Sequence, residues 1–400
     1  MKPALPFDEA QRRLIDLVSP LGKQLVATQD CIGRYLRAPL PAARTQPAAD
    51  LSAMDGYALP DGDAETWRII GESAAGRPFA ERLGPGESAR ISTGALMPDG
   101  ATRVLLQEEA IVEGNRLVIS PGGQASPHHI RRKGFDFRKG DIVLPKGMRI
   151  GPAQLALALS AGYGAGKLTV GRLPRVAIID SGNELSDDPA TMAPSQIPAS
   201  NGAMLAAMAA PFAADVERIG PVPDTMEALA EAFDSASDAH VMVTSGGASV
   251  GDHDLVRPAL EACGAKIDFW RIAMKPGKPL LVARRGTQIV LGLPGNPVSS
   301  YVTAWFFLLP LLRRLAGAAT PLPSPLRLPL AASLPAVGPR TEFVRARFGP
   351  DGLTPVIQQD SSALGALAVA DLLIRREAGD AAARPGDVLP AYPLQNGANA

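Results

Sequence analysis

The sequence predicts a multidomain α/β plus β protein, in which an α/β domain with a mostly parallel sheet is joined to smaller β-rich parts. Between residues 173 and 318, continuous apolar runs alternate with helical stretches, the pattern of a parallel sheet covered by helices. Between residues 41 and 140, short apolar runs are broken by Gly, Pro and Asp, which indicates strands joined by tight turns. A chain of 400 residues is also too long for one compact domain.

The composition excludes several classes of protein. Lys plus Arg and Asp plus Glu each number 40, so the chain lacks the positive field that holds nucleic acid or an anionic membrane. The longest apolar stretch, residues 301–312, contains Pro310 and is shorter than the roughly 20 residues of a membrane span. Cys31 and Cys263 cannot form a disulfide framework, and the N-terminal residues lack a signal-peptide core. We therefore expect a cytoplasmic protein.

The predicted elements follow in chain order. Residues 7–18 have helical periodicity, and Asp8 and Glu9 suit the positive end of that helix. Residues 151–159 are expected to form another helix, with proline tolerated in its first turn. In the α/β part we expect strands in RVAIID, DVERIG, HVMVT and QIVLGL, and helices in residues 201–210, 254–263 and 298–315. A Pro-rich boundary after Gly317 then precedes RTEFVRARF, GLTPVIQ and DLLIRR, which indicates a small β domain.

The segment TSGGASVGD, residues 244–252, is the first candidate for chemistry. It follows a strand, and its glycines and serines can form a nest of backbone N–H groups and hydroxyls that suits a phosphate. A single Gly-rich loop is more often an ordinary turn, but here the hydroxyls and the neighbouring acids favour a phosphate site. Such loops lie at the carboxyl ends of the strands, where α/β sheets bind ligands.

Two further loops carry prolines. In KPGKP, residues 275–279, two prolines stiffen the loop and two lysines can converge on one anion, so an oxyanion site is favoured over a solvated turn. In GLPGNP, residues 292–297, a strand ends and a helix begins. Contact with a ligand and the simple requirements of a turn explain the glycines and prolines of this loop about equally well.

Several acids follow the same strands. Glu184, Asp224, Asp252 and Asp254 are candidates to hold Mg²⁺, which prefers oxygen ligands beside phosphates. Any one of them alone would more often be a solvated residue or a helix cap. The four histidines have no spacing typical of a zinc site. In the β-rich part, SAMDGYA and IRRKGFD place acids and cations on turns, and composition alone leaves both as surface loops.

Taken in order, SAMDGYA, ISTGALMPDGA, IRRKGFD, SGNEL, TSGGASVGD, KPGKP and GLPGNPVS resemble one family, the MoeA-type molybdopterin molybdotransferases, which includes the E domain of gephyrin. The resemblance runs from residue 7 to residue 393. It implies insertion of molybdenum from molybdate into adenylylated molybdopterin, with release of AMP and with Mg²⁺ as the cofactor. The implied partners are those two substrates, a second copy of the chain, and transient contact with the molybdopterin adenylyltransferase; no nucleic acid and no membrane are expected.

The resemblance also implies a division into four parts. Residues 1–40 and 141–172 would form a discontinuous helical linker domain that dimerises. Residues 41–140 would form the β-rich inserted domain, 173–318 the α/β molybdopterin-binding domain, and 319–400 a small β-barrel-like domain.

The family's functional residues can be carried over motif by motif. The phosphate and pterin side would be Ser245, Gly246, Gly247, Ser249 and Gly251, with Pro294 and Asn296 beside it. Glu184, Asp224 and Asp254 match acids important for activity and are the expected metal ligands, and Lys275 and Lys278 match the molybdate-binding lysines. Arg345 or Arg347 and Ser361 or Ser362 match further oxyanion partners. Asp55, Thr93 and Asp136 match active-site positions of the β-rich domain.

Two other functions remain open on this sequence. A molybdopterin adenylyltransferase uses the same type of α/β domain, although the β-rich and C-terminal parts would then be superfluous. A non-catalytic scaffold, as in gephyrin, would require an interaction partner and usually additional domains.

Overall fold

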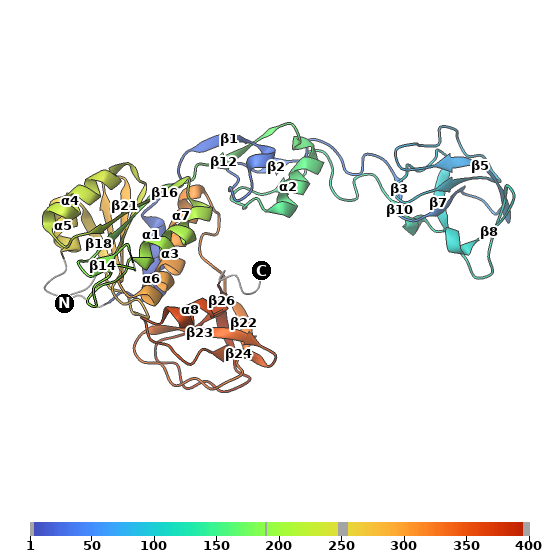
Figure 1. Cartoon of the computed structure of the whole chain (residues 1–400). Helices are drawn as coiled ribbons and strands as arrows, with labels where there is room; N and C mark the ends of the chain where they lie inside the picture. Colours follow the sequence, from blue (N-terminus) through green and yellow to red (C-terminus); the bar gives the residue numbers. More distant parts are fainter. Residues whose placement is uncertain (1–3, 189, 247–254, 395–400) are drawn as a thin grey trace.

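The computed structural model describes residues 4–188, 190–246 and 255–394, and the chain forms four parts in an elongated arrangement (Figure 1). The α/β domain and the C-terminal domain lie next to each other at one end, a linker domain lies in the middle, and the β-rich domain lies at the far end. The predicted fold class is confirmed. No helix among the described residues is long and apolar enough to cross a membrane.

A six-stranded mixed sheet forms the centre of the α/β domain. Its order is β16 (Asp215–Val222), β13 (Arg175–Ser181), β17 (Val241–Ser245), β21 (Gln288–Leu293), β20 (Leu281–Arg285) and β18 (Lys266–Trp270). The first four strands are parallel, and β20 and β18 are antiparallel to their neighbours. The sheet is therefore mostly parallel, as the alternation of strands and helices predicts.

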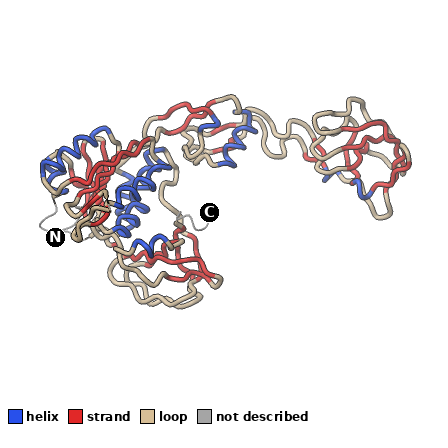
Figure 2. Tube along the Cα trace, in the orientation of Figure 1, coloured by secondary structure: helices blue, strands red, loops and turns tan. Residues whose placement is uncertain are grey.

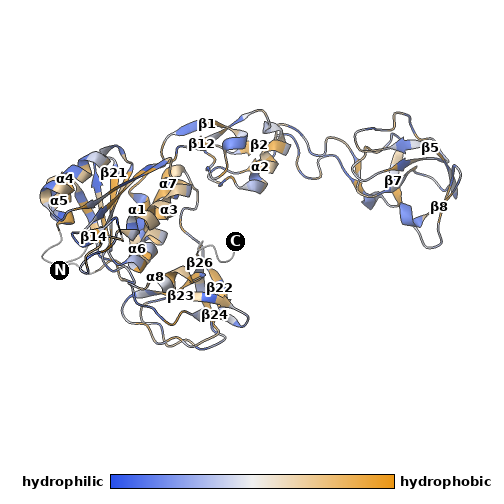
Figure 3. Cartoon of the chain, in the orientation of Figure 1, coloured by the Kyte–Doolittle hydropathy of each residue, from blue (hydrophilic) through white to orange (hydrophobic). Residues whose placement is uncertain are grey.

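Helices cover both faces of this sheet (Figure 2). Val176 and Ile178 of β13 pack under one helical layer, whereas Ala177 and Ile179 pack under the other, because successive side chains of a strand point to opposite faces. The first layer contains α1 (Phe7–Asp16), α3 (Ser200–Ala209), α6 (Pro297–Thr303) and α7 (Leu309–Ala316), and the second contains α4 (Met226–Ser235) and α5 (Val256–Ala262). Figure 3 shows the apolar residues concentrated in these layers.

A π-helical turn, η7 (Ala304–Leu308), separates α6 from α7, where the sequence predicts one continuous helix. Pro310 has no N–H to offer the carbonyl oxygen four residues earlier, at Phe306. The side chain of Gln11, on α1, supplies the missing donor: its Nε2 lies 2.8 Å from that oxygen.

The first helix departs from the predicted domain division. Residues 1–40 are predicted to belong to the linker domain, but Phe7, Ala10 and Leu14 of α1 are buried in the core of the α/β domain. The ring of Phe7 also lies 4.9 Å from that of Phe343 in the C-terminal domain, measured between centroids. The apolar stripe of α1 therefore joins these two domains.

The linker domain is less helical than predicted. It consists of β1 (Lys23–Ala27) paired with β12 (Lys167–Gly171), β2 (Leu40–Pro41) paired with β11 (Ile142–Leu144), and the short helix α2 (Pro152–Ala158).

The β-rich domain is built on a second six-stranded sheet. The order is β7 (Ala101–Leu106), β4 (Gly56–Pro60), β6 (Glu87–Ile91), β5 (Thr66–Ser73), β9 (Arg116–Ile119) and β8 (Ala110–Glu113). At the end that faces the linker, β3 (Leu51–Ser52) pairs with β10 (Ile130–Arg131).

The C-terminal domain has a third six-stranded sheet. It contains β22 (Leu326–Pro329), β23 (Thr341–Gly349), β24 (Gly352–Pro355), β25 (Leu372–Arg376) and β26 (Val388–Pro393), beside the short helix α8 (Leu364–Ala368). The sixth strand, β19 (Met274–Lys275), comes from the α/β part of the chain and pairs in parallel with β23. The sheet therefore anchors the start of KPGKP. A small parallel pair, β14 (Leu185–Ser186) and β15 (Ile197–Pro198), completes the strands.

Candidate active site

Three loops meet at the carboxyl ends of β13, β17 and β21. Gly246, which follows β17, has φ 101°, and a Cβ atom there would lie 2.7 Å from the carbonyl oxygen of Ser181 at the end of β13. A Cβ atom on Gly295, beyond β21, would lie 3.7 Å from the Cα of Gly246. Only glycine fits at position 246, because the loop both takes a left-handed conformation and touches its neighbours. The loops form one edge, as expected for parallel strands.

The predicted phosphate loop is described only at its start. Ser245 is buried at the end of β17, and Gly246 begins the turn. Gly247, Ser249, Gly251 and Asp254 lie outside the described residues. The buried hydroxyl oxygens of Ser181 and Thr244 beside this turn have no hydrogen-bond partner among the described residues. Unused hydroxyls at a strand edge are suitable donors to a ligand oxygen.

Glu184 and Asp224 come together on the neighbouring strand ends. The backbone N–H of Asp224 donates to Oδ1 of Asn183, at 3.1 Å. Burial raises the pKa of Asp224, and the charge of Glu184 raises it further. The carboxylate of Glu184 packs against Gly182, which has φ 153°. A Cβ atom at position 182 would lie 2.7 Å from Oε2 of Glu184, so the lack of a side chain there leaves space for the carboxylate. Within the described residues, no three His, Cys, Asp or Glu side chains gather as a complete metal site would require.

Asp180 is an acid that the sequence analysis did not select. It ends the apolar run of β13, is 4% exposed, and its Oδ1 has no hydrogen-bond partner among the described residues. Burial raises its pKa to about 6, despite Arg218 at 3.9 Å and the backbone N–H of Gly202. The signal available in the sequence was a carboxylate inside an apolar strand. Burying a charged carboxylate costs free energy, and acids with pKa values shifted by burial are often found at functional sites.

The KPGKP loop is held from several sides. Lys275 lies on β19, and its Nζ is 3.1 Å from Oε1 of Glu342 on β23. Gly277 has φ 105° and sits against the side chain of Thr303, and the carbonyl oxygen of Lys278 accepts from the N–H of Ile272 at 3.0 Å. Both lysine side chains are exposed. The loop therefore presents two ammonium groups on a fixed backbone.

The GLPGNP loop is tied to two other parts of the chain. Asn201 Nδ2, at the start of α3, donates to the carbonyl oxygen of Gly295 at 2.7 Å. Asn296 Nδ2 donates to Oγ of Ser361 in the C-terminal domain at 3.0 Å. Pro294 is buried, whereas Asn296 is exposed. This loop thus brings the predicted serine segment to the edge of the α/β domain.

Of the two predicted arginines, Arg345 is buried. It is 2% exposed, and its guanidinium donates to the carbonyl oxygens of Asp360 at 2.9 Å and Ala363 at 3.3 Å. Its side chain therefore holds the 359–363 loop in place. Within that loop, Ser362 Oγ donates to Oδ1 of Asp360 at 2.5 Å. Arg347 is exposed and is the better placed of the two predicted arginines.

The predicted residues of the β-rich domain form a separate group. The backbone N–H of Thr93 donates to Oδ1 of Asp55 at 2.7 Å. The pairing of β3 with β10 and the bond from the N–H of Gly94 to the carbonyl oxygen of Ser52 bring the three motifs of this domain together. Asp136 is exposed on the third motif. In one chain the β-rich domain that carries this group lies at the opposite end of the molecule from the α/β domain (Figure 1).

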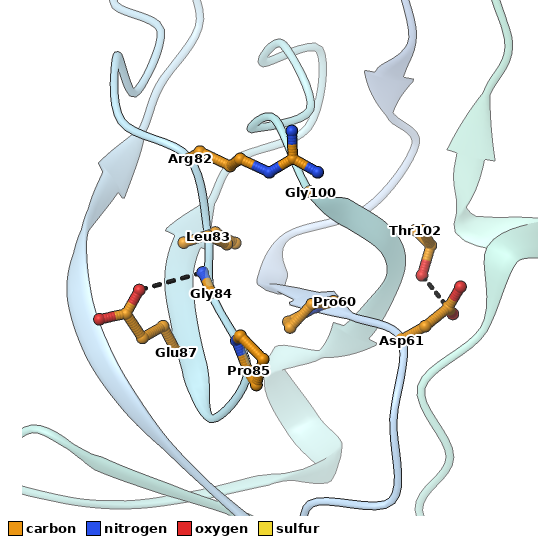
Figure 4. A pocket seen from close by; sticks show the side chains of 9 residues that line it. All are labelled: Pro60, Asp61, Arg82, Leu83, Gly84, Pro85, Glu87, Gly100 and Thr102. Carbon is orange, nitrogen blue, oxygen red and sulfur yellow. Dashed lines mark hydrogen bonds between the residues drawn. The ribbon is translucent and has the colours of Figure 1, made fainter.

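A hollow of about 400 Å³ lies elsewhere in the β-rich domain (Figure 4). Thr102 Oγ1 donates to Asp61 at 2.6 Å, and the N–H of Gly84 donates to Glu87 at 3.0 Å. These polar groups are satisfied within the hollow, and none of the predicted site residues lines it. We therefore place the candidate active site at the loops.

Three family models match consecutive regions of the chain. The MoeA N-terminal region (domain I and II) matches residues 5–162, a probable molybdopterin binding domain matches 177–314, and the MoeA C-terminal region (domain IV) matches 327–394. A molybdopterin molybdenumtransferase of Bacillus subtilis is 32% identical over 92% of this chain and 89% of its own length. One of Haemophilus influenzae is 32% identical over 78% of both chains. The chain belongs to the molybdopterin molybdenumtransferase family.

Solved structures agree with this membership in the MoeA family. The molybdopterin biosynthesis MoeA protein of Pyrococcus horikoshii OT3 superposes with a TM-score of 0.81 at 23% identity, covering 98% of this chain and all of that one. A second crystal structure of a Pyrococcus MoeA protein gives a TM-score of 0.73 at 26% identity, over 98% and 99% of the two chains. The four-part arrangement is therefore that of MoeA proteins over the whole chain.

Proposed function

We propose that this chain is a molybdopterin molybdenumtransferase, a transferase that inserts molybdenum from molybdate into adenylylated molybdopterin and releases AMP in molybdenum cofactor biosynthesis. The observation that carries the proposal is that the turn at Gly246, the acids Glu184 and Asp224, and the lysine loop lie at one edge of the α/β sheet. The lysine loop reaches this edge because it leads into β20, whose first residue, Leu281, pairs with Gly292 at the carboxyl end of β21. The name of the relatives and the three matched regions support the same reaction.

The arrangement suits a substrate with many negative charges. The adenylylated pterin brings a phosphoanhydride and molybdate brings two further charges. Exposed Lys275 and Lys278 attract oxyanions, and the hydroxyls of Ser181 and Thr244, which have no partner among the described residues, are further donors beside Gly246. Such contacts act before and during bond cleavage without any reorganisation of the protein.

The reaction itself distinguishes the alternatives. The purified protein with adenylylated molybdopterin and molybdate should release AMP and yield a cofactor that activates a molybdoenzyme. Release of pyrophosphate from molybdopterin and ATP would instead identify an adenylyltransferase, and neither activity would identify a scaffold. The matches to the N-terminal and C-terminal MoeA regions, beyond the α/β domain, favour the molybdenumtransferase.

We also propose Mg²⁺ as the metal, held by Glu184 and Asp224, with Asp254 as a third ligand from outside the described residues. One support is the partly buried carboxylate of Asp224, whose pKa is raised by burial and further by the nearby charge of Glu184. The other is the preference of Mg²⁺ for a few carboxylates completed by phosphate oxygens and water. Bound Mg²⁺ would offset the charge of the phosphoanhydride.

Replacing the acids tests this metal site. Glu184→Gln and Asp224→Asn should slow AMP release more than they weaken pterin binding, because an amide keeps the shape of the side chain and loses its charge. Glu217→Gln, which neutralises an exposed acid of β16, is the matched control. Cleavage at the wild-type rate in both variants would show that the acids are structural.

We propose that the active form is a homodimer whose clefts combine Asp55 of one subunit with the α/β loops of the other. Two features support this. The β-rich domain that carries Asp55 lies at the far end of the chain from the α/β domain (Figure 1). The linker domain also exposes large apolar side chains, among them Leu25 (66% exposed) and Ile142 (56% exposed). Symmetry can bring separated regions of two copies together, and exposed apolar patches are typical of interfaces.

Subunit mixing tests the shared cleft. Inactive Asp55→Asn chains are mixed with inactive Lys275→Ala chains and allowed to exchange. In a mixed dimer one cleft carries both lesions and the other carries none, so part of the activity should return. If exchange is verified and activity stays at background, each cleft is built within one chain.

We propose that the reaction takes place in the cytoplasm. We also propose transient contact with the molybdopterin adenylyltransferase, which would deliver the adenylylated substrate. The two free thiols, Cys31 and Cys263, favour a reducing cytoplasm.

A further inference from the structure

A cavity of about 420 Å³ lies at the junction of the linker domain and the α/β domain. The linker contributes Tyr35 and residues 145–149. The α/β domain contributes Phe212, at the end of η5 (Ala210–Phe212), and Arg313, in the last turn of α7. Ala319 and Thr320 close the lining. None of these residues belongs to the candidate active site.

Two arginines from different domains line this cavity and contact the same phenylalanine ring. The guanidinium carbon of Arg149 lies 5.2 Å from the centroid of the Phe212 ring, and that of Arg313 lies 4.9 Å from the same centroid. Burial lowers the pKa of Arg313, and the positive charge of Arg149 lowers it further. Lys146 adds a third cation to the lining.

No carboxylate balances these charges among the residues that the structure describes. Neither arginine nor Lys146 takes part in an ion pair within 4.0 Å there. The polar contact found for Arg149 is a long one, from its Nε to the carbonyl oxygen of Gly33 at 3.4 Å. Tyr35 is buried beside both arginines, and burial raises the pKa of its hydroxyl, which is therefore a neutral donor.

Arg313 is partly buried, whereas Arg149 and Lys146 are exposed, so water screens part of the repulsion between these like charges and the shared aromatic ring offsets a further part. A planar guanidinium matches the geometry of phosphate-type oxyanions, to which it donates two hydrogen bonds at once. The negative end of the α7 dipole amounts to about half a charge, much less than the three cations of the lining. The electrostatics therefore favour an anion.

We propose that this cavity binds a tetrahedral oxyanion of the phosphate type, either free or as a phosphomonoester. Because Arg149 belongs to the linker and Arg313 to the α/β domain, a bound anion would hold the two domains together. The site is distinct from the proposed catalytic cleft: from Pro297 to Arg313 the helical segment spans about 24 Å, at 1.5 Å for each residue.

The test is calorimetric titration of the full-length protein with inorganic phosphate and, separately, with AMP, at constant ionic strength. Arg149→Gln and Arg313→Gln should each weaken phosphate binding about tenfold or more, since each removes charge-assisted hydrogen bonds. Arg172→Gln removes an exposed guanidinium of the linker that does not line the cavity and should leave binding unchanged. Lys275→Gln should also leave it unchanged, which separates this site from the cleft.

Two further measurements make the result decisive. Arg149→Lys keeps the positive charge and loses the planar guanidinium, which can donate two hydrogen bonds to one oxyanion. Its affinity for phosphate should therefore fall between those of the wild type and of Arg149→Gln. Circular dichroism verifies that each variant is folded. AMP binding that is lost in Arg149→Gln and kept in Lys275→Gln identifies a phosphomonoester, whereas loss for phosphate alone identifies a free oxyanion. Absence of saturable phosphate binding in the wild type, or wild-type affinity in both glutamine variants, overturns the proposal.

Discussion

Replacing Asp180 with asparagine should stabilise the α/β domain at neutral pH. The pKa of this acid rises from 3.8 to about 6 because its carboxylate is buried. Between these two values the unfolded chain has released the proton and the folded chain still holds it, so stability falls as pH rises through this window. Above pH 6 this loss of folding stability is complete. At about 1.36 kcal/mol for each pKa unit, the free energy of unfolding is lowered by about 3 kcal/mol.

Asparagine keeps the shape of the protonated acid and never ionises. The partner it gives up, Arg218, is half exposed and 3.9 Å away, so this ion pair is worth less than about 1 kcal/mol. Asp180→Asn should therefore be more stable than the wild type by about 2–3 kcal/mol at pH 7.5, and by about half as much at pH 5.

Urea unfolding followed by tryptophan fluorescence measures this difference. The chain has 3 tryptophans, and in a Trp67→Phe background the remaining two, Trp270 and Trp305, both report on the α/β domain. Glu217→Gln, at an exposed acid of the neighbouring strand, should show no such pH dependence. A difference between Asp180→Asn and wild type that does not grow from pH 5 to pH 7.5 would refute the reasoning.

Four other substitutions have definite expected outcomes. Lys275→Ala and Lys278→Ala should each raise the molybdate concentration needed for AMP release about tenfold or more without changing the melting temperature, and unchanged molybdate dependence would contradict their role. Phe7→Ala should cost about 3–5 kcal/mol in urea unfolding, because its ring is buried between two domains; a loss below about 1 kcal/mol would show that α1 does not join them. Gly202→Ala should cost about 1–3 kcal/mol and lower the melting temperature, because its Cβ would overlap Oδ2 of Asp180, and an unchanged melting temperature would contradict this close packing.

Local patterns were sufficient to predict the α/β sheet and its helices. The strands β13, β17 and β21 are buried on both faces, so each is a continuous apolar run in the sequence. Such runs can be recognised as strands without knowing which strands they pair with. The break between α6 and α7 was not predictable in this way. Pro310 is visible in the sequence, but the donor that satisfies the carbonyl oxygen of Phe306 is the side chain of Gln11, 295 residues away, which no local pattern shows.

Some residues of the candidate site could likewise be selected from local sequence motifs, and others could not. Motif order was enough to select Glu184, Asp224 and the lysine loop, because these residues lie at strand ends whose edge the topology fixes. The burial of Arg345 was not visible, since it depends on the 359–363 loop folding back over β23. Asp180 was missed for the opposite reason: its apolar neighbours made it look like part of the core, and burial is what gives this carboxylate its raised pKa.

The junction between the linker and the α/β domain links the two proposed sites. The N–H of Leu21 donates to the carbonyl oxygen of Leu315 at 2.8 Å, and that of Ala319 donates to the carbonyl oxygen of Gly147 at 3.1 Å. Gly171 packs so closely on Ala316 that any side chain there would overlap its carbonyl oxygen. Backbone contacts of this kind fix an angle between domains, because they tolerate little sliding. If a cleft takes Asp55 from one subunit and the lysine loop from the other, this angle sets the distance between them, and an anion bound by Arg149 and Arg313 would add one more contact that holds the same junction.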